Sequence, residues 1–188
     1  MTTHTPARST LYDADQLEVV IAAMARRTAA LLAGIEQAAV IGIRRRGAPL
    51  ADRICARLRD DHGLPSPLRV DLDIKRYADD LSLLFPQTRL QEDAGEAAVD
   101  LAGVTVLLVD DVLYTGHSLL TAIDHLARRQ PAQIRVAVLA DRCTCRLPVH
   151  ADIVGVRLQV APGDIVECRV PPFEPEFGID LLRKAAAA

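Results

Sequence analysis

Helical and strand-like hydrophobic patterns follow one another along the first third of the chain. Apolar residues recur at helical spacing over 13–34, and Asp13 and Gln16 at the start of this stretch have the spacing of a capping box. The short apolar run 38–43 predicts a buried strand, and the pattern over 49–61 predicts a second helix with a proline in its first turn. The loop between these two elements holds three successive arginines and a glycine.

The same alternation continues through the rest of the chain. Further elements are expected at 68–74 (strand), 104–109 (strand), 116–129 (helix), 134–140 (strand), 153–158 (strand) and 165–170 (strand). The unbroken apolar run at 104–109 is typical of a central parallel strand, and a loop is expected after it at 110–116. The segment 79–98 is polar and poorly periodic, so it is interpreted as a long excursion. These patterns predict an α/β fold with a largely parallel central sheet, in a single domain over 1–188.

The composition narrows the range of functions. Three Tyr, three Phe and no Trp argue against a base-stacking platform for single-stranded nucleic acid, and a net charge of −3 disfavours binding through a global basic field. No apolar run reaches the length of a membrane span and the N-terminus lacks the apolar core of a secretory signal, so we expect a cytoplasmic protein. The four cysteines lack the spacing of a zinc site and are interpreted as reduced thiols.

The loop after the strand 104–109 carries the most distinctive candidate chemistry. Its adjacent carboxylates, Asp110 and Asp111, repel each other and need a compensating partner, such as a polyhydroxyl ligand or a hydrated divalent cation. The segment 115–118, Thr-Gly-His-Ser, follows at a helix start, where free N–H groups and the helix dipole favour an anion. Together these features suit a sugar phosphate. The chain contains neither a Walker A loop nor a GxGxxG dinucleotide fingerprint.

The segment 106–118, VLLVDDVLYTGHS, resembles the motif with which type I phosphoribosyltransferases bind phosphoribosyl pyrophosphate (PRPP). More narrowly, it resembles the PyrR family of pyrimidine-operon regulators and uracil phosphoribosyltransferases. Four other segments are similar to that family in the same order, namely 40–47, 73–81, 138–142 and 147–152. The resemblance covers about 11–164. It implies the type I phosphoribosyltransferase fold, with a flexible lid at 74–98 and a small hood with the C-terminal segment over 141–184.

The resemblance also implies a PRPP site with Asp110, Asp111 and Arg46 as its catalytic residues. The two carboxylates would hold the ribose hydroxyls, the loop 115–118 would grip the 5-phosphate, and Arg46 would contact the pyrophosphate. The implied PRPP and nucleotide contacts are Arg45, Arg46, Gly47, Asp110, Asp111, Val112, Leu113, Tyr114, Thr115, Gly116, His117 and Ser118. Mg²⁺ would accompany PRPP and would reach Asp110 and Asp111 only through the ribose hydroxyls or water.

A lid and a base site complete the implied machinery. The lid residues are Arg76, Tyr77, Asp79 and Asp80, and the residues near the base are Ala140, Asp141 and Arg142, acting mainly through their backbone. The implied reaction converts uracil and PRPP to UMP and pyrophosphate. Family resemblance further implies a homo-dimer or larger homo-oligomer, with RNA as a further partner in pyrimidine-responsive regulation.

Several positions depart from the family pattern. His117 and Ser118 replace an Arg and a Thr of the phosphate loop, where backbone N–H groups do most of the binding. Ala78 replaces an Arg of the lid, which bears on closure over PRPP. His150 and Val156 replace basic residues, which bears on RNA binding. Two alternatives therefore stay open, a nucleotide-sensing regulator with little catalysis and a phosphoribosyltransferase for another base.

Overall fold

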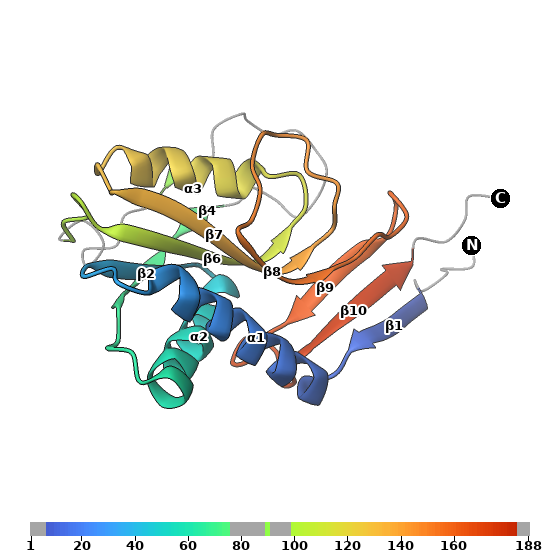
Figure 1. The fold of residues 1–188 in the computed structure, drawn as a ribbon. Helices are drawn as coiled ribbons and strands as arrows, with labels where there is room; N and C mark the ends of the chain where they lie inside the picture. The colour runs from blue at the N-terminus through green and yellow to red at the C-terminus, as the bar shows by residue number, and fades with distance from the viewer. Residues whose placement is uncertain (1–6, 76–88, 91–98, 184–188) are drawn as a thin grey trace.

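The computed structural model describes residues 7–75, 89–90 and 99–183, and a parallel sheet of five strands forms its centre (Figure 1). The strands are β2 (Ala38–Ile43), β3 (Leu68–Leu72), β6 (Thr105–Leu113), β7 (Gln133–Asp141) and β8 (Ile153–Arg157). Their order is β3-β2-β6-β7-β8, and every neighbouring pair is parallel. The carboxyl ends of these strands therefore share one edge of the sheet, which is where ligands bind in such folds.

Helices cover both faces of the central sheet (Figure 1). They are α1 (Ala14–Leu32), α2 (Gly47–His62) and α3 (His117–Ala127). Leu107 and Val109 of β6 pack into one core with α1 and α2, whereas Val106 and Leu108 pack into the other core with α3. This division follows from the alternation of side chains along a strand. Within the described ranges, no helix combines the length and the apolar character that crossing a membrane requires.

A second, antiparallel sheet, which we call the hood sheet, joins both ends of the described chain (Figure 1). Its strands, in the order β1-β10-β9, are β1 (Ala7–Tyr12), β10 (Gly178–Arg183) and β9 (Ile165–Arg169). A two-residue pair, β4 (Ile74–Lys75) with β5 (Arg89–Leu90), forms a third sheet. The thiol of Cys168 in β9 lies 3.9 Å from the carbonyl oxygen of Asp111. The hood sheet therefore packs beside the carboxyl end of β6.

The structure confirms most of the predicted elements, corrects the start of one loop and shows strands that were not predicted. The capping box of Asp13 and Gln16 is present at the start of α1. The predicted loop at 110–116 is wrong in its first half, because β6 continues to Leu113 and stays paired with β7. The sequence analysis also missed β1 and β10. Both lack an apolar run, since β1 exposes several polar residues and β10 buries the charged Asp180.

Asp180 lies between two arginines at the centre of the hood sheet. Only 2% of this residue is exposed. Its Oδ2 atom is 2.7 Å from Nε of Arg8 on β1 and 3.0 Å from Nε of Arg169 on β9. Burial raises the pKa of Asp180, but hydrogen bonds from Arg8 and Thr10 and the charge of Arg169 outweigh burial, so the pKa is lowered overall. One carboxylate thus ties both outer strands of the hood sheet to the middle strand.

We expect Asp180→Asn to lower the free energy of unfolding at pH 7 by about 1–3 kcal/mol, because it leaves the two arginines without their shared charge. Because the pKa of Asp180 is lowered in the folded state, this stabilisation is present above about pH 4, the ordinary range of an unfolded Asp, and is lost as pH falls through the folded pKa. Urea unfolding at pH 7 and in acid measures both effects. The control Asp60→Asn, in an exposed pair with Arg59, should leave stability nearly unchanged. An equal loss in both variants would contradict the expectation.

Candidate active site

The loop after β2 lies against the carboxyl end of β6. This loop, 44–46, leads directly into α2, whose first residue is Gly47. A Cβ atom on Gly47 would lie 2.4 Å from the carbonyl oxygen of Val109 and 3.1 Å from the Cα atom of Asp110. Any side chain there would displace the loop, so glycine is required for this close approach. Arg46 at the end of this loop is thereby held near Asp111, whereas Arg44 pairs with Asp71 of β3.

The two adjacent carboxylates have different surroundings. Asp110 is 2% exposed, and its Oδ1 atom accepts a hydrogen bond of 2.9 Å from the N–H of Asp111. Asp111 Oδ2 lies 3.9 Å from Nη1 of Arg46. The repulsion expected between these neighbours is therefore offset by a backbone N–H on one carboxylate and a guanidinium on the other.

Arg46 is also bound by the C-terminal part of the chain. Its Nε and Nη2 atoms donate to Oε1 of Glu174 at 3.0 and 2.5 Å, which raises the pKa of Arg46. Burial raises the pKa of Glu174, but the hydrogen bonds from Arg46 and from the N–H of Val170, with the charge of Arg45, lower it overall. The Arg45 guanidinium stands 5.1 Å from the ring centre of Phe173. The sequence analysis missed Phe173 and Glu174, because no motif or periodicity marks them.

The predicted phosphate loop, 115–118, forms the amino end of α3. Gly116 adopts a φ of 90°, and no side chain of the described residues caps this helix. The N–H groups of its first turn are therefore left for an anion. The Nδ1 atom of His117 lies 2.9 Å from the Thr115 hydroxyl oxygen. The amino end of α2 has no side-chain cap either, so two such helix ends lie at the same edge of the sheet as Asp110 and Asp111.

The loop after β7 contacts the backbone of the phosphate loop. The N–H of Arg146 donates to the carbonyl oxygen of Thr115 at 3.2 Å, and the thiol of Cys145 lies 3.6 Å from the same oxygen. A Cβ atom on Gly116 would lie 2.7 Å from that sulfur, a second reason for glycine here. The four cysteines are all free thiols, and burial raises the pKa of Cys168 well above its usual value. The sequence analysis assigned no role to the 144–146 segment.

The predicted base site lies at the end of β7, and its residues also take part in the packing of the fold. Ala140 is fully buried, and Asp141 ends the strand. The guanidinium of Arg142 lies 4.2 Å from the ring centre of Tyr114 and donates to the backbone carbonyl just before β9. The N–H of Arg142 donates to the carbonyl oxygen of Leu113 at 3.0 Å. Arg142 therefore joins the ends of β6 and β7 through its N–H and reaches the segment before β9 through Nη2, whereas its buried Nε donates to no other described group.

The predicted lid lies mostly outside the part of the chain that the structure describes. Its four predicted residues, Arg76, Tyr77, Asp79 and Asp80, lie outside the described residues. Within the described part of the chain, no group of three or more His, Cys, Asp or Glu could hold a metal ion.

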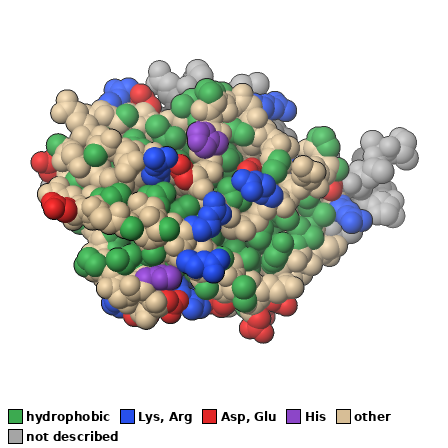
Figure 2. Space-filling view, in the orientation of Figure 1, with side chains coloured by type: hydrophobic (Ala, Val, Ile, Leu, Met, Phe, Trp, Pro, Cys, Tyr) green, Lys and Arg blue, Asp and Glu red, His purple; other side chains and the backbone are tan. Residues whose placement is uncertain are grey.

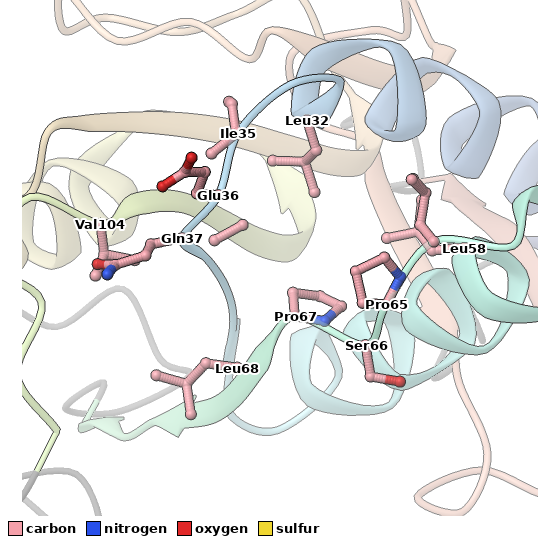
Figure 3. A pocket seen from close by; sticks show the side chains of 12 residues that line it. Leu32, Ile35, Glu36, Gln37, Leu58, Pro65, Ser66, Pro67, Leu68 and Val104 are labelled. Atoms are coloured by element: carbon pink, nitrogen blue, oxygen red, sulfur yellow. The ribbon is translucent and has the colours of Figure 1, made fainter.

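A mostly apolar cavity of about 390 Å³ lies at the other edge of the central sheet (Figure 3). Ala38 and Leu68, the first residues of β2 and β3, line it together with Leu32, Ile35 and Pro65. Because β2 and β3 are parallel, this is the amino edge of the sheet. The cavity is therefore separate from the site described above, and it gathers no cluster of charged groups.

Comparison with known proteins identifies the class to which this site belongs. Residues 7–172 match the family model of the phosphoribosyl transferase domain. The chain is 40% identical over 171 residues to the bifunctional protein PyrR of Roseiflexus sp. (strain RS-1), covering 90% of this chain and 91% of that protein. It is 35% identical to the bifunctional protein PyrR of Chloroflexus aurantiacus, with coverages of 94% and 96%. The chain therefore belongs to the PyrR family of type I phosphoribosyltransferases.

The fold also resembles that of solved structures. The hypoxanthine phosphoribosyltransferase of Trypanosoma cruzi superposes with a TM-score of 0.74 at 20% identity, and the likeness covers 98% of this chain and 94% of that one. At this identity the likeness concerns the fold alone. It confirms the predicted type I phosphoribosyltransferase architecture.

We expect Gly47→Ala to lower the free energy of unfolding by about 2 kcal/mol and to weaken the binding of inorganic pyrophosphate, because the new Cβ pushes the 44–46 loop from β6. Gly34→Ala is the control. Gly34 has a φ of 75° and open space around its Cβ position, so this change should cost about 1 kcal/mol of strain and leave pyrophosphate binding intact. Urea unfolding and calorimetric titration measure the two effects. Unchanged pyrophosphate affinity in Gly47→Ala would show that the close approach does not position the anion site.

Proposed function

We propose that the chain is a uracil phosphoribosyltransferase of the PyrR type, which converts uracil and PRPP to UMP and pyrophosphate. Membership of the family supports this assignment. One geometric observation carries it: two uncapped helix amino ends lie at the same edge of the sheet as the Asp110 and Asp111 pair. PRPP has a matching set of groups, because its 5-phosphate and its 1-pyrophosphate lie on either side of a ribose diol. Each helix end suits one anion, and the carboxylates suit the diol.

The position of each residue at the site determines the part of PRPP that it would contact. The amino end of α3 would hold the 5-phosphate, and Asp110 and Asp111 would accept hydrogen bonds from the ribose hydroxyls. Arg46 would neutralise the negative charge that grows on pyrophosphate as the bond from C1 breaks and the electron pair leaves with the pyrophosphate. Uracil would form a bond from its N1 atom to the electron-poor C1 atom, from a fixed position near the ends of β6 and β7, and the N1 proton would pass to water. No general base is assigned among these residues.

The predicted Mg²⁺ belongs to the same proposal. Asp110 and Asp111 would reach the ion only through the ribose hydroxyls or water, which suits an ion that arrives with PRPP. When bound, the ion would supply further neutralisation of the leaving group. Assembly into a homo-oligomer stays a prediction from family resemblance.

The first test is UMP formation by the purified protein with PRPP, Mg²⁺ and uracil. We expect Asp110→Asn and Asp111→Asn each to reduce kcat/KM for PRPP by about 100-fold or more, because each removes charge from the diol site. Asp124→Asn is the matched control, since Asp124 is exposed on α3 and pairs with Arg128. It should retain full activity. Circular dichroism would verify that all variants fold.

The same assay separates the alternatives. Hypoxanthine, guanine and orotate are offered in place of uracil. Turnover with one of these bases and none with uracil would assign the protein to another base. Binding of UMP or PRPP without turnover on any base would overturn the enzyme assignment and leave a nucleotide-sensing regulator.

Regulation through RNA is a second candidate function, favoured by the word bifunctional in the names of both relatives. Figure 2 shows several Lys and Arg side chains close together near the middle of one face, although the net charge of the chain is −3. A local basic area of this kind can contact phosphates without a global basic field. His150 is exposed where the family has an arginine, which removes one charge from such contacts.

We expect the protein to bind a pyrimidine-operon leader transcript more tightly with UMP than without it. The affinity should fall as salt rises, because phosphate contacts release counterions. Filter binding at two salt concentrations measures this, with a scrambled RNA of the same length as control. Equal affinity for both RNAs would assign the binding to nonspecific charge.

A further inference from the structure

The segment 170–174, between β9 and β10, lies on the loop that carries Arg45 and Arg46. Phe173 and Glu174 each contact one of these arginines, through a cation–π contact and a salt bridge. The N–H of Phe173 donates to the carbonyl oxygen of Val170 at 3.1 Å, which closes the segment into a turn. The segment is thus a compact turn that covers the arginines after β2.

The carboxylate of Glu174 is held at both of its oxygens. Oε1 accepts from Nε and Nη2 of Arg46, and Oε2 accepts from the N–H of Val170 at 2.7 Å. The side chain of Glu174 is 19% exposed and that of Arg46 is 31% exposed. The pair is therefore partly shielded from water and fixed by its own turn, unlike an exposed ion pair between two long side chains.

The bond to Glu174 occupies the Nε and Nη2 side of the Arg46 guanidinium. That side presents two parallel N–H groups, the arrangement with which arginine binds carboxylates and phosphates. The remaining nitrogen, Nη1, faces Asp111 at 3.9 Å. An incoming pyrophosphate group that binds Arg46 through its paired Nε and Nη2 side must therefore displace Glu174, whose contacts with Arg46 are shorter than that of Asp111.

We propose that Glu174 is a built-in competitor for the pyrophosphate group of the substrate. This inference rests on the proposed function, in which Arg46 neutralises the pyrophosphate leaving group. In the free protein Glu174 holds the guanidinium, so its carboxylate lowers the affinity for pyrophosphate and PRPP. After the reaction, the return of Arg46 to Glu174 favours release of the pyrophosphate product. A competing carboxylate scales the apparent affinity by the fraction of molecules in which Arg46 is free.

A supporting role for Glu174 predicts the opposite result. If Glu174 only held Arg46 in the orientation that binds substrate, removing its charge would weaken pyrophosphate binding. If Glu174 competes, removing its charge strengthens that binding. The sign of the change in affinity therefore separates a competitor from a positioning residue.

The test is calorimetric titration of inorganic pyrophosphate, with Mg²⁺, into the wild type, Glu174→Gln and Glu176→Gln. Glutamine keeps an oxygen for the N–H of Val170 and loses the charge that holds Arg46. We expect Glu174→Gln to bind pyrophosphate about 3- to 10-fold more tightly than the wild type, and its KM for PRPP to fall in parallel. Glu176→Gln is the control, because Glu176 lies in the same connection and pairs with Arg169, 3.1 Å away. It should bind as the wild type does.

Every outcome bears on the proposal. Equal or weaker pyrophosphate binding by Glu174→Gln, or equal tightening in both variants, would overturn competition by Glu174. Absence of pyrophosphate binding in all three proteins would overturn it as well, because Arg46 would then not belong to an anion site. If the wild type forms no nucleotide with any base while Glu174→Gln still binds pyrophosphate more tightly, the proposed function fails and the competition stands.

Discussion

The arrangement of the site depends on the parallel pairing of β2 with β6. Because these strands run side by side in the same direction, the loop after β2 and the carboxylates at the end of β6 emerge at one edge. The contact between Gly47 and the Val109 carbonyl then fixes how closely the two loops approach. Without it, the arginines after β2 would stand farther from Asp110 and Asp111. The relative position of the loop after β2 and the carboxylates of β6 is thus determined by the packing of the backbone.

Charged groups at this edge of the sheet are partnered by other groups of the protein. Arg46 lies between Asp111 and Glu174, and Arg142 stacks on Tyr114 while it bonds to backbone carbonyls. Such partners offset the cost of removing charged groups from water. They also mean that a ligand must exchange existing contacts for new ones. The site is therefore pre-organised in position, although some of its charges are already engaged.

Much of the central fold could be predicted from the sequence, and much of the hood sheet could not. The strands at 38–43 and 104–109 are covered by helices on both sides of the sheet. Their residues are therefore apolar along the whole run, a pattern that can be recognised in the sequence. β10 has no such pattern, because it buries Asp180, whose burial is offset by Arg169 on the preceding strand and by Arg8 on the N-terminal strand β1, far away in sequence. Local periodicity cannot report a partner about 170 residues distant. Phe173 and Glu174 escaped prediction for the same reason.

The resemblance to a family located Asp110, Asp111, Arg46 and the loop 115–118, and the structure brings these residues to one edge of the sheet. Their individual roles in binding stay predictions, as do those of the lid residues, which lie outside the described ranges. Adjacent carboxylates and a Thr-Gly segment are local signals, so sequence alone could reveal them. What the sequence could not reveal is how the arginine is shared, because that depends on where the C-terminal turn packs.

The hood sheet therefore contacts the candidate active site, although the residues of its strands carry no sequence signal that predicts this contact. Asp180 ties β1 and β9 to β10, Cys168 of β9 packs against the backbone of Asp111, and the turn between β9 and β10 places Glu174 on Arg46. A displacement of this sheet would move the carboxylate that holds Arg46 relative to the end of β6. The N-terminal strand β1 is an outer strand of the same sheet and is joined to β10 by backbone pairing and by the ion pair of Arg8 with Asp180. The contact between the hood sheet and the site is therefore made by β9 and by the turn after it, whereas β1 completes the sheet that carries them.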